Sequence, residues 1–306
     1  MRYTLILTLF LCAQLGLNGQ SAQKHTTLNE AMKASEKVEW LDLICEDVPK
    51  IANRFGELPK LESLYLRGCK LSELPEGMEE ASNLGLLNVQ DNDLKTLPTE
   101  LSELKELSVI NLRNNAFRKV PKALLSLPKL REVDLTGNKE LKLKRALRSL
   151  SKVKKLDFLY LNNLGIKTLP TQIRGLTQLK ELHLADNPGL DLTIVSFALK
   201  KAENLRILVL SGNEITSVSY ELTKLYDLEG LVLDNNPRLA LGNLIQRLYK
   251  MPNLKVLLLR NNQLTRLPEY LDGLNKLAVL DLSQNNFSDA EKARIKSELP
   301  NTNVVF

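Results

Sequence analysis

Apolar and polar positions follow one order along this chain, and that order repeats many times. In one copy, Leu254, Leu257, Leu259 and Leu264 surround Asn262. Around Leu257 and Leu259 the period is two, which sends these two side chains to one face of a strand and the residue between them to the other. Each copy therefore predicts a short strand with inward leucines, followed by a tight bend.

The copies follow one another at steps of 23 or 26 residues. Shorter copies carry a proline after an apolar residue, as in Leu97-Pro98, which favours extended or 3-10 turns. Longer copies continue an apolar rhythm that has room for one or two helical turns. Because one copy cannot bury its apolar face alone, its neighbours must stack on it. The copies start at Val38, Leu61, Leu84, Leu107, Leu130, Leu156, Leu179, Leu205, Leu228, Leu254 and Leu277.

This spacing predicts the α/β fold class, in the form of a horseshoe-shaped solenoid. About eleven parallel strands form its concave sheet, and short helical or 3-10 segments return along the convex side. We expect one domain of repeats over residues 38–299. A capping box at Thr27 and Glu30 predicts a capping helix within residues 23–37. At the other end, a charged helix over residues 290–299 leads to a capping strand within residues 300–306.

The ninth position of each copy is usually an asparagine. Its amide can bond backbone groups of the tight bend, which burial would otherwise leave without partners. Three copies differ, with Glu46, Cys69 and Leu164 at this position, and we expect an irregular bend at Leu164. The asparagines are Asn92, Asn115, Asn138, Asn187, Asn213, Asn236, Asn262 and Asn285.

The first 22 residues have the features of a signal peptide. Arg2 precedes an uncharged apolar run from Leu5 to Leu17, and small residues follow near Gly19–Ala22. The run is too short for a transmembrane segment. The sequence therefore predicts export, to the extracellular space, the periplasm or the cell surface. Lipidation at Cys12 is a second, less favoured possibility, since Leu11 is bulky where such processing prefers a small residue.

Cys45 and Cys69 are the two cysteines that would remain after cleavage. They are 24 residues apart in 23-residue repeats, hence one position out of register. An exported protein can pair such cysteines, but pairing needs a distorted first repeat. Two separate thiols are the favoured interpretation, and a disulfide stays open.

The charge distribution and the reactive residues of the chain argue against several functions but identify none. The net charge is +6, and one return segment concentrates eight cations: Lys139, Lys142, Lys144, Arg145, Arg148, Lys152, Lys154 and Lys155. These can keep a convex surface solvated or bind an anionic polymer or glycan. We find no catalytic or metal-ligand pattern and expect neither an enzyme nor a cofactor. Asp134, Asp234 and Asp281 are interpreted as solvated strand residues in separate repeats. Export argues against a nucleic-acid partner.

The repeat unit, for example Leu94 to Leu104 with Leu97-Pro98, resembles that of secreted bacterial leucine-rich-repeat proteins with 23-residue repeats. It is also similar to the unit of Ras-associated leucine-rich-repeat scaffolds. The resemblance covers residues 27–306 and implies a horseshoe that binds proteins through its concave face. It supplies no functional residue, because the matching positions are the buried ones.

The concave face offers a candidate site in its C-terminal half. From Phe158 and Tyr160 onward the face turns apolar, with Val209, Val232 and Leu258 between the inward leucines of repeats eight to ten, and an exposed apolar strip marks an interaction surface. We therefore expect a non-enzymatic module that binds a protein or peptide there, with Val209, Val232 and Leu258 pointing into solvent. The predicted site residues are Phe158, Tyr160, His183, Val209, Val232, Asp234, Leu258, Arg260 and Asp281.

Overall fold

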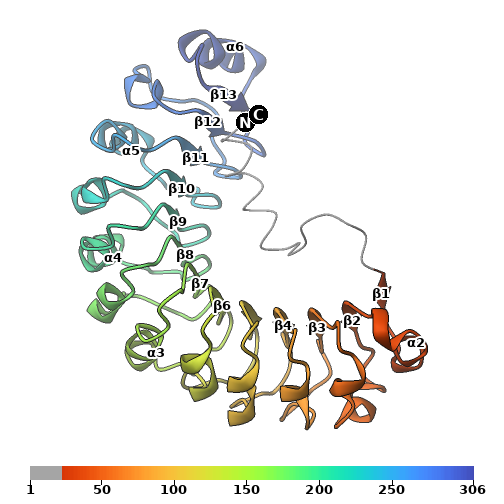
Figure 1. The fold of residues 1–306 in the computed structure, drawn as a ribbon. Helices are drawn as coiled ribbons and strands as arrows, with labels where there is room; N and C mark the ends of the chain where they lie inside the picture. Colours follow the sequence, from red (N-terminus) through yellow and green to blue (C-terminus); the bar gives the residue numbers. More distant parts are fainter. Residues whose placement is uncertain (1–22) are drawn as a thin grey trace.

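Short parallel strands stack in chain order along the inner face of a curved solenoid (Figure 1). The computed structural model describes residues 23–306, so the predicted signal peptide and Cys12 lie outside the described residues. Over that range the sheet has thirteen strands, each paired with the strands before and after it. They are β1 Lys24–His25, β2 Trp40–Asp42, β3 Ser63–Tyr65, β4 Leu86–Asn88, β5 Val109–Asn111, β6 Glu132–Asp134, β7 Phe158–Tyr160, β8 Glu181–His183, β9 Ile207–Val209, β10 Gly230–Val232, β11 Val256–Leu258, β12 Val279–Asp281 and β13 Asn303–Val305.

The predicted horseshoe and its strand register are confirmed. Residues one repeat apart pair directly, as Leu231 does with Leu208 and Leu257. The inward leucines, such as Leu231 and Leu233, are completely buried between the sheet and the return segments. The sheet has two strands more than the eleven predicted for the repeats. One of them, β13, is the expected capping strand. The other, β1, was not predicted, because a strand of two residues shows no alternation of apolar and polar positions.

Return segments alternate between two kinds along the C-terminal half. Three α-helices, α3 Leu143–Leu150, α4 Leu192–Leu199 and α5 Leu241–Leu248, lie in the 26-residue repeats. The intervening repeats return through 3-10 turns, and α4 packs between two of them. The 3-10 segments are η1 Ser35–Lys37, η2 Val48–Ile51, η3 Phe55–Glu57, η4 Met78–Glu80, η5 Thr99–Glu103, η6 Lys122–Ser126, η7 Thr171–Gly175, η8 Tyr220–Lys224 and η9 Asp272–Leu274.

A helix lies near each end of the solenoid. In α2 (Leu28–Lys33), the Thr27 side chain accepts a hydrogen bond from the Glu30 amide, as a capping box does. The buried Asp47 carboxylate accepts another from the Leu28 amide at 2.8 Å and ties α2 to the first repeat. In α6 (Asp289–Glu298), Ser288 caps the first turn in the same way.

The ninth-position asparagines bond the bends, and they do so across two repeats. Asn187 is fully buried. Its Nδ2 donates to the carbonyls of Leu161, Leu184 and Ala185, at 3.1, 2.9 and 3.1 Å. Its Oδ1 accepts from the amides of Leu164 and Ile166, both at 3.0 Å. Each such side chain therefore fastens the preceding bend as well as its own.

The expectation of an irregular bend at Leu164 is wrong. Asn163 and Gly165 have positive φ values of 53° and 69°, the same conformation as Gly212 and Glu214 on either side of Asn213. The bend is regular because the amide of Leu164 is held by Asn187 from the next repeat.

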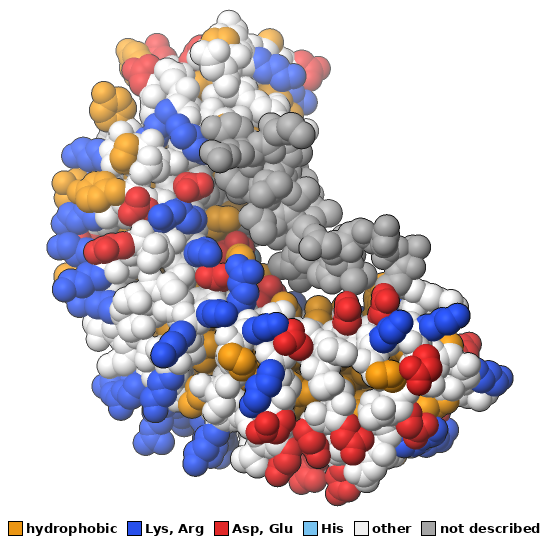
Figure 2. Space-filling view, viewed as in Figure 1, with side chains coloured by type: hydrophobic (Ala, Val, Ile, Leu, Met, Phe, Trp, Pro, Cys, Tyr) orange, Lys and Arg blue, Asp and Glu red, His pale blue; other side chains and the backbone are white. Residues whose placement is uncertain are grey.

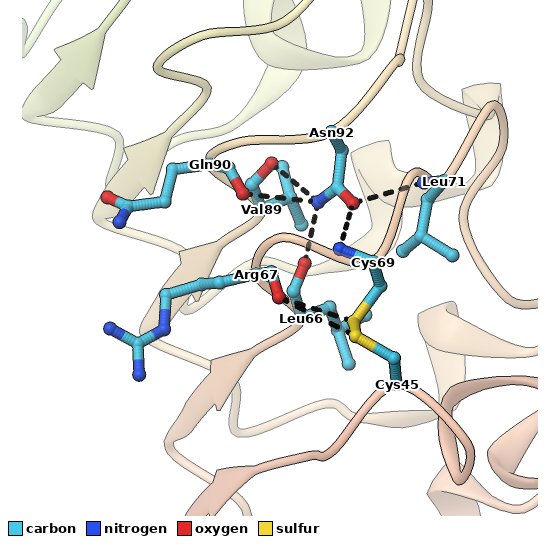
Figure 3. The surroundings of a disulfide bond; sticks show 8 residues. All are labelled: Cys45, Leu66, Arg67, Cys69, Leu71, Val89, Gln90 and Asn92. Atoms are coloured by element: carbon cyan, nitrogen blue, oxygen red, sulfur yellow. Dashed lines mark hydrogen bonds between the residues drawn. A yellow bond between two sulfur atoms is a disulfide. The ribbon is translucent and has the colours of Figure 1, made fainter.

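Cys45 and Cys69 form a disulfide, so the preference for two separate thiols is wrong (Figure 3). Their Cα atoms are 5.1 Å apart. The first repeat has the distortion that pairing requires. After β2 the Ile44 amide donates to Thr26 O at 3.1 Å, and a turn at Cys45 leads directly into η2. This path brings Cys45 next to the regular bend that holds Cys69, whose amide donates to Asn92 Oδ1 at 2.9 Å.

Candidate binding surface

The predicted site residues lie on adjacent strands of the concave sheet. Tyr160, His183, Val209, Val232 and Leu258 form one column across β7 to β11, each paired with the next. Phe158 lies two residues earlier on β7, and Asp281 continues the column on β12. The register therefore brings the predicted residues into one continuous surface.

The apolar part of this column is buried rather than open to solvent, contrary to the sequence-based expectation. Val209, Val232 and Leu258 expose only 4%, 2% and 5% of their surface. They pack with Ile207, Val256 and Val279 in a second hydrophobic cluster, separate from the main core. On a concave sheet with strands about 4.8 Å apart, branched side chains converge and cover one another. We call these six residues the apolar floor.

Asp234 and Arg260, predicted as part of a polar rim, bind each other. Arg260 Nε and Nη2 lie 2.9 and 2.7 Å from Asp234 Oδ2, and the Arg260 amide donates to Oδ1 at 2.7 Å. The expectation of a solvated Asp234 is wrong, because this residue is only 3% exposed. Asp281 Oδ1 accepts from the Ser283 amide at 2.9 Å and lies at the same edge.

A hollow of about 640 Å³ extends along the concave face over β3 to β8, from Tyr65 and Arg67 at one end to the apolar floor at the other. The end next to the floor, which we call the acidic hollow, is lined by Glu132, Asp134, Tyr160, Glu181 and His183. Burial raises the pKa of Glu132 to about 7, and the charges of Asp134 and Glu181 add to this effect. Burial also raises the pKa of Asp134. Asp134 therefore converges with other acids, which corrects its interpretation as an isolated solvated residue.

The hollow was not predicted as a unit. Glu132 and Glu181 stand in a strand column that is otherwise mostly apolar in the C-terminal half, and this exception was the available signal. His183 Nε2 lies 2.5 Å from Glu181 Oε1, and its ring stacks on Tyr160 with centroids 4.1 Å apart. The pair joins the hollow to the predicted site.

Replacing Glu132 with glutamine is expected to stabilise the protein in alkaline solution. A carboxyl whose pKa is raised by folding binds its proton more tightly in the folded state, so stability falls as pH rises from the ordinary value of 4.5 through about 7. The full shift corresponds to about 3 kcal/mol, and partial exposure reduces this to about 2 kcal/mol. Urea unfolding should therefore show a gain of about 2 kcal/mol at pH 8 and almost none at pH 4.5.

The matched control for this prediction is Glu62→Gln, which removes an exposed carboxylate. It should change stability little at either pH. An equal gain for Glu132→Gln at both pH values would contradict the assigned burial effect.

The basic return segment lies on the convex side, around α3. Its eight cations are all exposed, whereas Ala146, Leu147 and Leu150 of α3 face the core. Glu140 is paired with Arg118 at 3.5 Å. Figure 2 shows Lys and Arg side chains gathered on this outer side of the curve. The segment thus forms a solvated basic surface away from the concave site.

Exposed aromatic residues on the return segments of the C-terminal half were not predicted. Phe197, Tyr249 and Tyr270 are 51%, 74% and 76% exposed. Tyr220 lies within 6 Å of three cationic side chains, those of Lys224, Arg247 and Lys250.

Among residues 23–306, no group of three or more His, Cys, Asp or Glu side chains is arranged to hold a metal ion. Over the same range, no helix is both long and apolar enough to cross a membrane.

Comparisons with known proteins agree with this geometry. Models of leucine-rich repeats match residues 60–80, 82–139 and 252–293. No curated protein matches the sequence. Among solved structures, TLR13 in complex with the RNA ssRNA13 is 25% identical with a TM-score of 0.59. That match covers 84% of this chain and 37% of TLR13.

Two bacterial structures are also similar. An internalin (InlF) from Listeria monocytogenes is 19% identical with a TM-score of 0.51, over 93% of this chain and 84% of the internalin. A leucine-rich-repeat protein of Leptospira interrogans is 24% identical with a TM-score of 0.40, over 93% of this chain and all of that one.

The parallel sheet, the returning turns and the asparagine bonds define a solenoid repeat protein. Its fold is that of a leucine-rich-repeat solenoid, and leucine-rich-repeat models match three segments of the chain.

Proposed function

We propose that this protein is a non-enzymatic module that binds a protein or peptide on its concave face, centred on β7 to β12. The leucine-rich-repeat fold is commonly used for protein binding. The observation that carries the proposal is the apolar floor, which lies on the side of the sheet opposite the main core. These buried side chains give the concave face a firm apolar base, and the partly exposed residues at its edge, such as Arg260 and Asp281, can form the polar rim of a partner site.

The partner would lie across the strands rather than in a deep pocket. The floor is tightly packed, so each of its residues has little area left to bury. Affinity must therefore come from many strands at once, with polar contacts at Asp281, Arg260 and His183 fixing the orientation. A protein surface or an extended peptide fits this requirement better than a small apolar molecule.

We further propose that the protein is exported and acts outside the cytoplasm. Support comes from the composition of residues 1–22 and from the Cys45–Cys69 disulfide, since disulfides persist in oxidising compartments. The extracellular space, the periplasm and the cell surface all fit. In such a compartment a protein or peptide is a more accessible partner than nucleic acid.

A second candidate function is adhesion to an anionic polymer or glycan through the basic return segment. The observation that favours it is the exposure of eight cationic side chains around α3. Binding of this kind should weaken steeply with ionic strength, whereas binding over the apolar floor should depend little on salt.

The test of the proposed function compares two variants in a pull-down from the native extracellular or envelope fraction. Val209→Thr with Val232→Thr keeps the shape of the floor and makes it polar, and it avoids placing charges in a packed cluster. We expect this variant to lose at least fivefold in affinity for the captured partner, while its circular dichroism stays unchanged.

The comparison variant is Lys142→Glu with Lys144→Glu on the convex side, which should retain the partner. If this variant loses the partner and the floor variant keeps it, the concave proposal fails and adhesion through the basic segment replaces it.

A further inference from the structure

We propose that the return segments around α4 bind the surface of a bilayer that contains anionic lipids. The site is a patch of exposed apolar side chains, Ile194, Phe197 and Tyr220, bordered by lysine and arginine side chains. We call it the convex patch. It lies on the side of the solenoid opposite the concave face, so this inference goes beyond the proposed function and does not depend on it.

The exposed face of α4 differs from those of the other two helices in the 26-residue repeats. In each of these eight-residue helices, the third and sixth residues are not buried. In α4 they are Ile194 and Phe197, which are 43% and 51% exposed. In the other two helices they are polar: Arg145 and Arg148 in α3, and Asn243 and Gln246 in α5. Polar residues therefore suit these positions of the fold, and packing alone does not explain the apolar pair of α4.

Tyr220 extends the apolar pair onto the next return segment. Ile194 and Phe197 are three residues apart, which makes them neighbours on one side of the helix. Directly before Phe197 and Tyr220, the Ser219 hydroxyl donates to Ser196 Oγ at 3.2 Å and joins η8 to α4. Tyr220 is 46% exposed. Figure 2 shows hydrophobic side chains on this outer side of the curve, between α4 and α5, with Lys and Arg side chains beside them. A contiguous apolar surface exposed in this way marks an interaction site.

Cationic side chains border the patch, and most of their charge is not neutralised. Four of them lie 4.9 to 5.6 Å from the centre of a ring: Arg174 over Phe197, and Lys224, Arg247 and Lys250 over Tyr220. Glu221 pairs with Lys224 at 2.8 Å. Arg247 and Lys250 have no acidic partner among residues 23–306. Like charges this close repel one another, so the patch is complementary to an anionic surface.

A bilayer surface fits this combination of side chains. Aromatic rings at the level of the headgroups, with lysine and arginine side chains on the lipid phosphates, are typical of membrane interfaces. The patch lies on the convex side of the curve, where a soft surface can enclose protruding side chains without a matching groove. Exposed tyrosines on neighbouring return segments, Tyr226 and Tyr249, suit the same level of the bilayer. Binding in this way leaves the concave face open to its partner.

The proposal is tested by cosedimentation of the protein with vesicles of phosphatidylcholine, with and without phosphatidylglycerol. We expect binding only when the anionic phosphatidylglycerol is present. The variant Ile194→Asn with Phe197→Gln gives α4 the residues that α5 has at the same positions. It should bind at least about tenfold more weakly, because two apolar side chains no longer leave water. Both side chains are exposed, so the circular dichroism spectrum should not change.

Ile44→Asn is the matched control. It removes an isoleucine of nearly the same exposure, 45%, from the first repeat and should bind as the unmodified protein does. Lys250→Gln tests the cationic border of the patch. Vesicle binding should weaken about fivefold in this variant, and added salt should then affect it less.

Insertion into lipid distinguishes a bilayer from a soluble anion. Trp40, on β2, is the only tryptophan of the chain, so Phe197→Trp places a fluorescent reporter in the patch. The emission of this variant should shift to shorter wavelengths on phosphatidylglycerol vesicles and should be quenched by brominated acyl chains. The unmodified protein should show neither change.

Any of three results would overturn the proposal. The first is equal vesicle binding by the unmodified protein and the Ile194→Asn, Phe197→Gln variant. The second is loss of vesicle binding only in the Lys142→Glu with Lys144→Glu variant, which assigns the vesicles to the basic return segment. The third is self-association in sedimentation velocity that the patch variant abolishes, without vesicle binding, which assigns the patch to a second copy of this chain.

Discussion

Replacing Asn187 with leucine is expected to lower the free energy of unfolding by about 3–6 kcal/mol. The substitution keeps the branching at Cγ but removes the Oδ1 acceptor for the amides of Leu164 and Ile166 and the Nδ2 donor for three carbonyls. Each buried backbone group left without a partner costs about 1–3 kcal/mol, and two amides lose theirs. Chemical denaturation followed by circular dichroism measures the loss.

The matched control is Leu164→Asn, which introduces the usual residue at the one ninth position in the middle of the solenoid where it is missing. The amide that an asparagine there would hold, that of Asn138, already donates to Leu135 O at 3.3 Å. The control should therefore change stability by less than about 1 kcal/mol. Comparable losses in both variants would show that the asparagine bonds are not the cause.

Reducing the Cys45–Cys69 disulfide is expected to cost about 3.5 kcal/mol at the N-terminal end of the solenoid. The bond closes a loop with a sequence separation of 24 residues, and constraint of the unfolded chain over such a loop gives this magnitude. Denaturation should shift to lower urea when reductant is added. Amide exchange should accelerate most in α2 and β1 to β3, because repeats contact only their neighbours.

The double variant Cys45→Ser with Cys69→Ser should behave without reductant as the reduced protein does. The unmodified protein, denatured without reductant, should show no free thiol at Cys45 or Cys69. Two free thiols, or identical stability with and without reductant, would contradict the bond.

Strand positions could be predicted from the sequence because eleven repeats share the same apolar pattern, so each repeat confirms the alignment of the others. The inward placement of Leu231 and Leu233 follows from a period of two and from the need to bury one face. The role of the ninth asparagine also followed, since a tight buried bend leaves backbone groups without partners. What the period could not show is that Asn187 serves Leu164, because that bond joins two repeats.

The candidate surface was predictable in position but not in environment. Register alone places Val209 beside Val232, whereas their burial depends on how closely curvature brings side chains together. The acidic hollow depends on residues from three repeats, and each acid considered alone resembles a solvated residue. Pairing of Cys45 likewise depends on the path of one irregular turn near α2. This turn occurs only in the first repeat, so the pattern shared by the other repeats could not predict it.

The alternation of helical and 3-10 return segments makes a pair of repeats, rather than a single repeat, the unit by which the C-terminal half can change in length. α4 packs against η7 on one side and η8 on the other. Removing residues 205–227 alone would place α4 beside α5, and two α-helices would have to pack where one α-helix and one 3-10 turn pack now. Removing residues 179–227 instead places α5 beside η7. This second deletion preserves both the strand register and the alternation of α-helical and 3-10 return segments. Versions shortened or extended within the C-terminal half should therefore fold readily only in steps of two repeats.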